Sequence, residues 1–101
     1  MNKKHFYGLS QSQLLSEVEQ ISDRIESLQY NVIDVIKICN QLLEIDLKMC
    51  TYEVREQILY TLCNAVGYYD VKNKLKLFPL LSIKNDIEKD LREYIDEIIC
   101  E

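Results

Sequence analysis

Glycine and proline are scarce in this chain, and tryptophan is absent: its 101 residues include two Gly and one Pro. Neither residue type occurs between Gly8 and Gly67. Because Gly and Pro are the residues that most strongly disfavour a helix interior, nothing in that stretch obviously stops a helix. Together with a hydrophobic content of 48%, this composition predicts one all-α domain.

Features that would mark an enzyme, a membrane protein or a nucleic-acid coat protein are also missing. No apolar run approaches the roughly 20 residues of a membrane span, and residues 1–8 lack the apolar centre of a signal peptide, so we expect a cytoplasmic protein. The formal net charge of −5 argues against coating nucleic acid. No Ser–His or Cys–His pair, Gly-rich loop or metal motif is recognisable, so we expect neither enzymatic activity nor a cofactor.

The cysteines and the single histidine do not form a metal-binding pattern. The cysteines are widely spaced, include no C-x-x-C pair, and stand at Cys39, Cys50, Cys63 and Cys100. Without a secretory signal, we interpret them as reduced residues of an apolar core, with a disulfide or a metal site as the alternatives. His5 lies in an N-terminal arm, residues 1–9, and has no set of ligands around it at motif spacing.

A heptad pattern organises the first half of the chain. Apolar residues recur there at alternating spacings of four and three, at Leu14, Val18, Ile21, Ile25, Leu28, Val32, Val35, Cys39 and Leu42. This pattern predicts one long helix over 10–48. Ser10 and Gln13 have the spacing of a capping box at its start.

Two alternatives remain for the long helix. An unbroken helix of this length spans about 57 Å, more than the diameter expected of a compact domain of this size. It must therefore project and pair with another copy, or break. The candidate break is Tyr30–Asn31, where Asn31 can cap a second helix. Because the heptad phase continues through that point, we predict one helix, with a four-helix antiparallel bundle as the alternative.

The first half of the predicted helix has a narrow apolar stripe flanked by charged residues. A narrow stripe is typical of a two-helix seam, and Glu17 and Arg24 occupy flanking g positions. We therefore predict a homodimer, with a self-association seam formed by Leu14, Val18, Ile21, Ile25 and Leu28. In the competing monomer, the C-terminal helix covers this stripe.

Two shorter helices are predicted to pack on the long one. The first covers 51–66, is capped by Thr51, and ends where Gly67 supplies a left-handed residue. An irregular linker follows over 67–81, and Pro79 ends any short helix in it. The last helix covers 82–100 and has apolar residues on one face. The predicted fold is thus an all-α helical bundle of one long and two shorter helices.

Two groups of residues are candidates for contact with a partner. The first is the acidic face of the last helix, which can meet a basic protein surface; it comprises Asp86, Asp90, Glu93 and Glu97. The second is an aromatic and basic group in the linker, formed by Tyr68, Tyr69, Lys72, Lys74, Lys76 and Phe78. Aromatic residues are enriched at interface hot spots. The alternatives are a solvated helix face and aromatics that close the end of the bundle.

The composition resembles that of small acidic helical proteins of low-GC bacteria and their phages. We expect a non-enzymatic protein-binding module, such as an inhibitor, an immunity protein or an anti-defence protein, that binds a protein target with a basic surface. The alternative is a small transcriptional regulator in which Lys72, Lys74 and Lys76 belong to the second element of a helix-turn-helix. We expect contact with neither a membrane nor, in the first hypothesis, nucleic acid.

Overall fold

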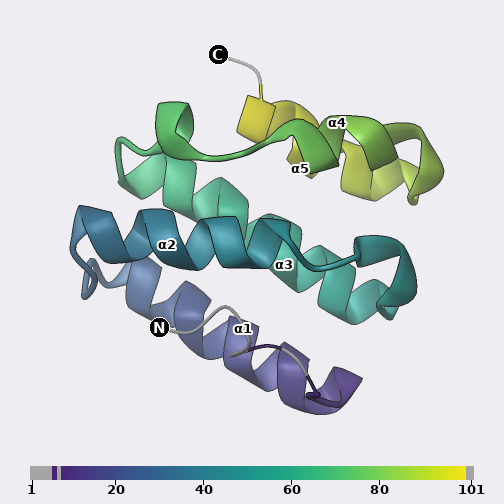
Figure 1. Cartoon of the computed structure of the whole chain (residues 1–101), viewed down its shortest axis with the longest axis horizontal. Coiled ribbons are helices and arrows are strands. Elements are labelled where there is room, and N and C mark those ends of the chain that lie inside the picture. The colour runs from purple at the N-terminus through teal and green to yellow at the C-terminus, as the bar shows by residue number, and fades with distance from the viewer. Residues whose placement is uncertain (1–5, 7, 100–101) are drawn as a thin grey trace.

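The computed structural model in Figure 1 describes residue 6 and residues 8–99. This part of the chain is all-helical, as predicted. Its α-helices are α1 (Gln11–Glu26), α2 (Val32–Leu43), α3 (Tyr52–Tyr68), α4 (Phe78–Ile83) and α5 (Lys89–Ile99). Short 3-10 turns, η2 (Leu47–Met49), η3 (Lys72–Lys74) and η4 (Lys84–Asp86), lie between them.

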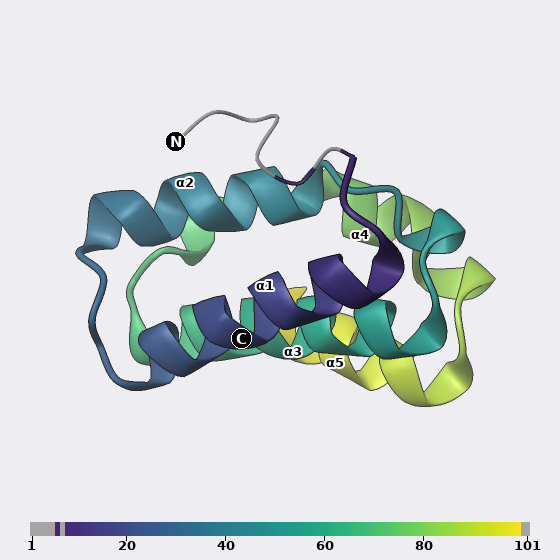
Figure 2. The same ribbon diagram turned by 90° about the horizontal axis from the view of Figure 1, so that it is seen from below.

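The helices form two layers. Figures 1 and 2 show α1, α3 and α5 side by side in one layer, and α2 and the stretch that contains α4 in the other. The Thr51 backbone N–H donates to the Gln11 side chain at the start of α1 (2.8 Å), and Asn64 donates to Glu26 at its end (2.7 Å). α1 and α3 therefore run in the same direction, and α2 returns between them along the chain.

The single helix predicted over 10–48 is wrong. α1 ends at Glu26, and the backbone reverses at Leu28, whose φ is +56°. The Leu28 N–H donates to the Ile25 carbonyl (3.0 Å) and the Gln29 N–H to the Arg24 carbonyl (2.9 Å). This pair of bonds is a Schellman motif with Leu where Gly usually stands. A helix of about 57 Å does not fit a molecule whose longest extent is 34 Å.

The alternative prediction, a break at Tyr30–Asn31, is confirmed, because α2 begins directly after Asn31. The Asn31 side chain accepts from the Asp34 N–H (2.8 Å) and caps α2. The capping box predicted at the start of α1 is also present, with Ser10 and Gln13 bonded reciprocally (2.9 and 3.1 Å). Thr51 caps α3 through the Val54 N–H (3.3 Å). The starts of α1, α2 and α3 were therefore predictable from local polar residues.

The predictions for the second half of the chain need three corrections. α3 continues through Gly67 to Tyr68, so Gly67 does not end it. The linker predicted as irregular contains α4, and Pro79 lies in the first turn of that helix, where its missing N–H costs nothing. The last helix begins at Lys89, after η4, and not at 82. The described residues therefore form a bundle of five α-helices, one more than the four-helix antiparallel alternative, and α1 and α3 run parallel in it.

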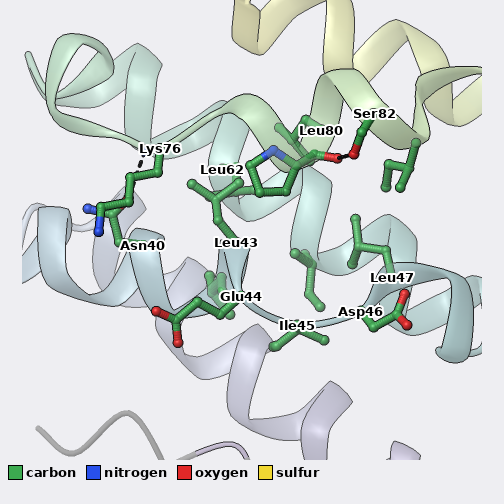
Figure 3. Close-up of a pocket in the computed structure, with 14 residues that line it drawn as sticks. Asn40, Leu43, Glu44, Ile45, Asp46, Leu47, Leu62, Lys76, Leu80 and Ser82 are labelled. Carbon is green, nitrogen blue, oxygen red and sulfur yellow. Dashed lines mark hydrogen bonds between the residues drawn. The ribbon is translucent and has the colours of Figure 1, made fainter.

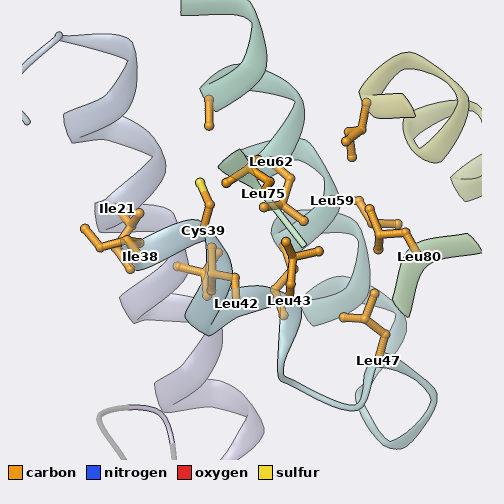
Figure 4. Packing of buried hydrophobic residues seen from close by; sticks show 14 of the residues in the cluster. Ile21, Ile38, Cys39, Leu42, Leu43, Leu47, Leu59, Leu62, Leu75 and Leu80 are labelled. Carbon is orange, nitrogen blue, oxygen red and sulfur yellow. The ribbon is translucent and has the colours of Figure 1, made fainter. Parts of the chain in front are cut away.

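The apolar core lies between the two layers and extends between neighbouring helices. Figure 4 shows Ile21 of α1, Leu42 of α2, Leu59 of α3 and Leu80 of the α4 stretch pointing into it. On the last helix, the predicted apolar face is confirmed, because Leu91, Ile95 and Ile98 are buried there. This face fixes the orientation of α5 and leaves its opposite face exposed.

Replacing Leu28 with Gly is expected to stabilise the protein. The Leu28 side chain is 60% exposed, so little packing is lost, while the left-handed backbone is relieved by about 1 kcal/mol. The melting temperature should rise by about 4–8 °C for a domain of this size. Leu28→Ala is the matched control, because it shortens the side chain but keeps the strained φ. The melting temperatures are measured by circular dichroism. An equal rise in the melting temperatures of both variants would contradict the backbone explanation.

Candidate functional site

A hollow lined by carboxylates lies between α3 and α5. It has a volume of about 370 Å³ and is lined by Glu56 of α3 and by Asp90, Glu93, Tyr94 and Glu97 of α5. We call it the acidic groove. The α5 residues stand three or four positions apart, which places them on one face of the helix. Since the opposite face of α5 is buried in the core, this face is directed outward.

Tyrosines join the two walls of the acidic groove. The Tyr52 hydroxyl donates to the Asp90 carboxylate across it. Farther along, the Tyr60 ring packs edge-on against Tyr94, with centroids 6.5 Å apart and planes at 83°. The Tyr60 hydroxyl also donates to Glu26 of α1 (2.6 Å). These contacts extend the surface from α5 across α3 to α1 and hold the aromatic rings in fixed orientations.

The phenol groups of this surface stay protonated. The hydrogen bond to Asp90, reinforced by burial and by nearby carboxylates, raises the pKa of Tyr52 to about 12. The bond to Glu26 raises the pKa of Tyr60, and burial raises that of Tyr94. All three hydroxyls therefore remain neutral hydrogen-bond donors at neutral pH, and the negative charge of the surface belongs to its carboxylates.

The negative charge of the acidic groove is not neutralised within the described part of the chain. The ion pairs of α5 and of the residues just before it involve carboxylates outside the acidic groove: Arg55 with Glu88 (2.6 Å), Lys48 with Asp86 (3.8 Å) and Lys84 with Asp96. Among the residues that the structure describes, none forms an ion pair with Glu56, Glu93 or Glu97. Like charges at this spacing repel one another, and a bound cation would relieve that repulsion.

The structure brings together only part of the predicted acidic face. Asp90, Glu93 and Glu97 meet in the groove, whereas Asp86 lies in η4 beside Lys48. Sequence reasoning missed Glu56 and the tyrosines, although Tyr52, Glu56 and Tyr60 follow one another at four-residue spacing. That spacing marks one exposed face of a helix and was available as a signal.

The aromatic and basic group of the linker does not form one site. Tyr68 is exposed in the last turn of α3, and Tyr69 donates its hydroxyl to the Tyr30 carbonyl (2.8 Å), which ties α3 to the α1–α2 turn. Phe78 is exposed at the start of α4. These residues are spread along the stretch that crosses the molecule between α3 and α4 (Figure 1).

The helix expected for a helix-turn-helix is not formed at the lysines. Lys72 and Lys74 lie in η3, a single 3-10 turn, and Lys76 follows it in non-helical backbone. The stretch is held to α2 by Asn40, whose side chain donates to the Lys74 carbonyl (3.2 Å) and accepts from the Lys76 N–H (2.9 Å). The lysine side chains are therefore not presented on a recognition helix.

The predicted self-association seam lies inside the monomer. Leu14, Val18, Ile21 and Ile25 are buried, and α1 makes its most extensive contact with α3 of the same chain. Leu28 is exposed in the turn. The apolar stripe of α1 is covered by α3 of the same chain. The two predicted partners of the stripe, a second copy and the C-terminal helix, are therefore both wrong.

A second, apolar hollow of about 340 Å³ lies between the end of α2 and α4. We call it the apolar pocket. Leu43, Leu47, Leu62 and Leu80 form its walls in Figure 3. Polar residues stand only at its ends: Asn40, Glu44 and Lys76 at one, and Asp46 and Ser82 at the other.

Neither hollow is a metal centre. In residues 8–99 and residue 6, no group of three or more His, Cys, Asp or Glu side chains is arranged to hold a metal ion. His5 and Cys100 lie outside the described residues. Cys39, Cys50 and Cys63 are free thiols, and burial raises the pKa of Cys39 and of Cys63 to about 12. These two thiols remain protonated and weakly nucleophilic at neutral pH.

Within the described residues, no helix is both long and apolar enough to cross a membrane.

Comparisons with known proteins supply no family for this fold. No protein-family model, no curated protein and no solved structure matches the chain. The acidic groove is a concentrated negative surface, because it brings together four carboxylates: Glu56, Asp90, Glu93 and Glu97.

Proposed function

We propose that this protein is a non-enzymatic protein-binding module whose acidic groove binds a lysine- or arginine-rich segment of a target protein. The observation that supports this proposal is the row of carboxylates without ion-pair partners in the described structure, set beside fixed tyrosine rings. Tyr and carboxylate side chains together bind cationic side chains through charge, hydrogen bonds and cation–π contact.

The groove has the dimensions of a peptide site. Asp90 and Glu97 are seven residues apart on α5, which corresponds to about 10 Å along the helix. An extended peptide advances about 3.3 Å per residue, so cationic residues three positions apart reach both ends of the row. We propose that by covering a basic surface of its target the protein acts as an inhibitor, immunity protein or anti-defence protein of a bacterium or phage.

A peptide titration tests this proposal. We expect a nine-residue peptide with Lys at every third position to bind in the groove and to shift the amide resonances of α5. The same peptide with its lysines clustered at one end should bind several-fold more weakly, because it cannot reach both ends of the row. Raising the salt concentration should weaken the binding of both peptides. The absence of binding at about 1 mM peptide would overturn the proposal.

Matched variants separate the groove from general negative charge. Glu93→Gln with Glu97→Gln should weaken binding about tenfold, because two charge-assisted contacts are lost. Glu19→Gln with Asp23→Asn removes the same charge from exposed positions of α1 and should change affinity less than twofold. Equal losses in both double variants would show that only net charge matters. Salt-sensitive binding of duplex DNA, tested in parallel, would instead favour the transcriptional regulator.

A further inference from the structure

We propose that the apolar pocket and α4 form a self-complementary surface on which a second copy of this chain docks, with Phe78 of each copy entering the pocket of the other. This proposal is independent of the acidic groove. The juxtaposition that carries it is an exposed aromatic side chain, 76% accessible, at the first residue of a helix whose other side lines an apolar hollow.

The two features lie next to each other on α4. Pro79, Leu80 and Ile83 line the pocket, while Phe78 and Leu81, on the outer side of the same helix, are exposed. A volume of about 340 Å³ is sufficient for one aromatic ring. Because projection and hollow lie next to each other, a two-fold rotation brings each projection to the other copy's hollow, which is the geometry of an isologous dimer.

The charges also favour a second copy over other partners. Glu44 and Lys76 stand at the same end of the pocket, and neither forms an ion pair with a described residue. A two-fold rotation that pairs Glu44 with the partner's Lys76 makes that contact twice. The acidic groove, by contrast, would repel an identical surface. The apolar pocket is therefore a better surface for self-association than the acidic groove.

The dimer is expected to be weak. α4 has six residues, and the apolar surface around the pocket is small compared with the roughly 800 Å² per partner of a stable interface. We expect a dissociation constant of about 100 µM, so that sedimentation equilibrium between about 20 µM and about 1 mM should show the change from monomer to dimer. A monomer at the highest concentration would overturn the proposal.

Surface variants locate the interface. Phe78→Asp should raise the dissociation constant at least tenfold and leave the helix content unchanged, since Phe78 is exposed. Leu28→Asp introduces the same change at another exposed position, in the α1–α2 turn, and should leave association unchanged. Loss of association in Leu28→Asp but not in Phe78→Asp would place the interface elsewhere and overturn the proposal.

Charge reversal tests the two-fold pairing itself. Glu44→Lys alone and Lys76→Glu alone should each weaken the homodimer, because each creates two repulsive contacts. An equimolar mixture of these two variants should form a heterodimer at least as tight as the unmodified homodimer, since both contacts are then attractive. A mixture that associates no better than the separate variants would contradict this pairing.

Discussion

Replacing both Ile21 and Ile25 with Asp is expected to leave the protein unfolded under conditions in which the unmodified chain is folded. These side chains are 2% and 0% exposed, respectively, in the contact between α1 and α3. A carboxylate without a partner in such a place costs several kcal/mol, whereas a domain of this size has a total stability of about 5–15 kcal/mol. Two such substitutions, each of which also removes a buried isoleucine side chain, together cost about as much as that total stability.

The measurement is far-ultraviolet circular dichroism combined with sedimentation velocity. The double variant should lose its helical signal, and Leu28→Asp, at the exposed heptad position, should keep it. A double variant that stays helical and sediments as a smaller species would show that the α1 stripe is an intermolecular seam after all. The experiment therefore separates the core position of this stripe from the dimer that its heptad pattern suggests.

Replacing Arg55 with Met is expected to lower the free energy of unfolding by about 2–4 kcal/mol. The guanidinium group donates to both oxygens of Glu88 (3.1 and 2.6 Å) and to the carbonyls of Leu47 and Cys50 (3.3 and 2.6 Å). One side chain thus joins α3 to the segment before it and to the residues that lead into α5. Met fills similar space but leaves these acceptors without a donor.

Arg92→Met is the matched control for urea denaturation. Its guanidinium group makes one hydrogen bond, from Nη2 to the Asn85 carbonyl (3.2 Å), and its buried Nε has no acceptor in the described structure. We expect a change below about 1 kcal/mol. An equal effect of the two substitutions would show that the loss at Arg55 does not come from its four hydrogen bonds.

The Arg55 variant should also change the response to acid. The bonds from Arg55 are the largest cause that lowers the pKa of Glu88. A carboxylate with a lowered pKa in the folded state stabilises the fold above its unfolded-state pKa, about 4.3, and this contribution disappears as the pH falls through the folded-state value. The difference in free energy of unfolding between the unmodified protein and Arg55→Met should therefore shrink below about pH 4. A constant difference down to pH 2 would contradict this role of the ion pair.

The parts of the fold that were predictable are those encoded by neighbouring residues. At the start of three helices, the side chain of the capping residue accepts a hydrogen bond from the backbone N–H three residues ahead, and the sequence signal for each start therefore lies within four residues: Ser10, Asn31 and Thr51. The buried face of α5 follows in the same way from its own spacing. Pro79 is ambiguous locally, since proline is compatible with both the end of one helix and the first turn of the next.

The candidate site was less predictable because it requires two helices. The spacing on α5 marks Asp90, Glu93 and Glu97, but Glu56 joins them only because α3 packs against α5. The exposed position of Phe78 likewise depends on α4, a helix that the local sequence pattern did not predict. Pairings between distant segments of this kind are not contained in the periodicity of either segment.

The turn at Leu28 has a consequence for the order in which the chain folds. A left-handed leucine is locally unfavourable, and the heptad pattern around it favours a continuous helix, so the isolated segment and the folded protein prefer different conformations. We expect the turn to become favourable when α3 covers α1. During synthesis, residues 10–48 emerge before α3, so we expect them to begin as one helix that bends when α3 arrives. Formation of this turn should therefore be a late event in folding.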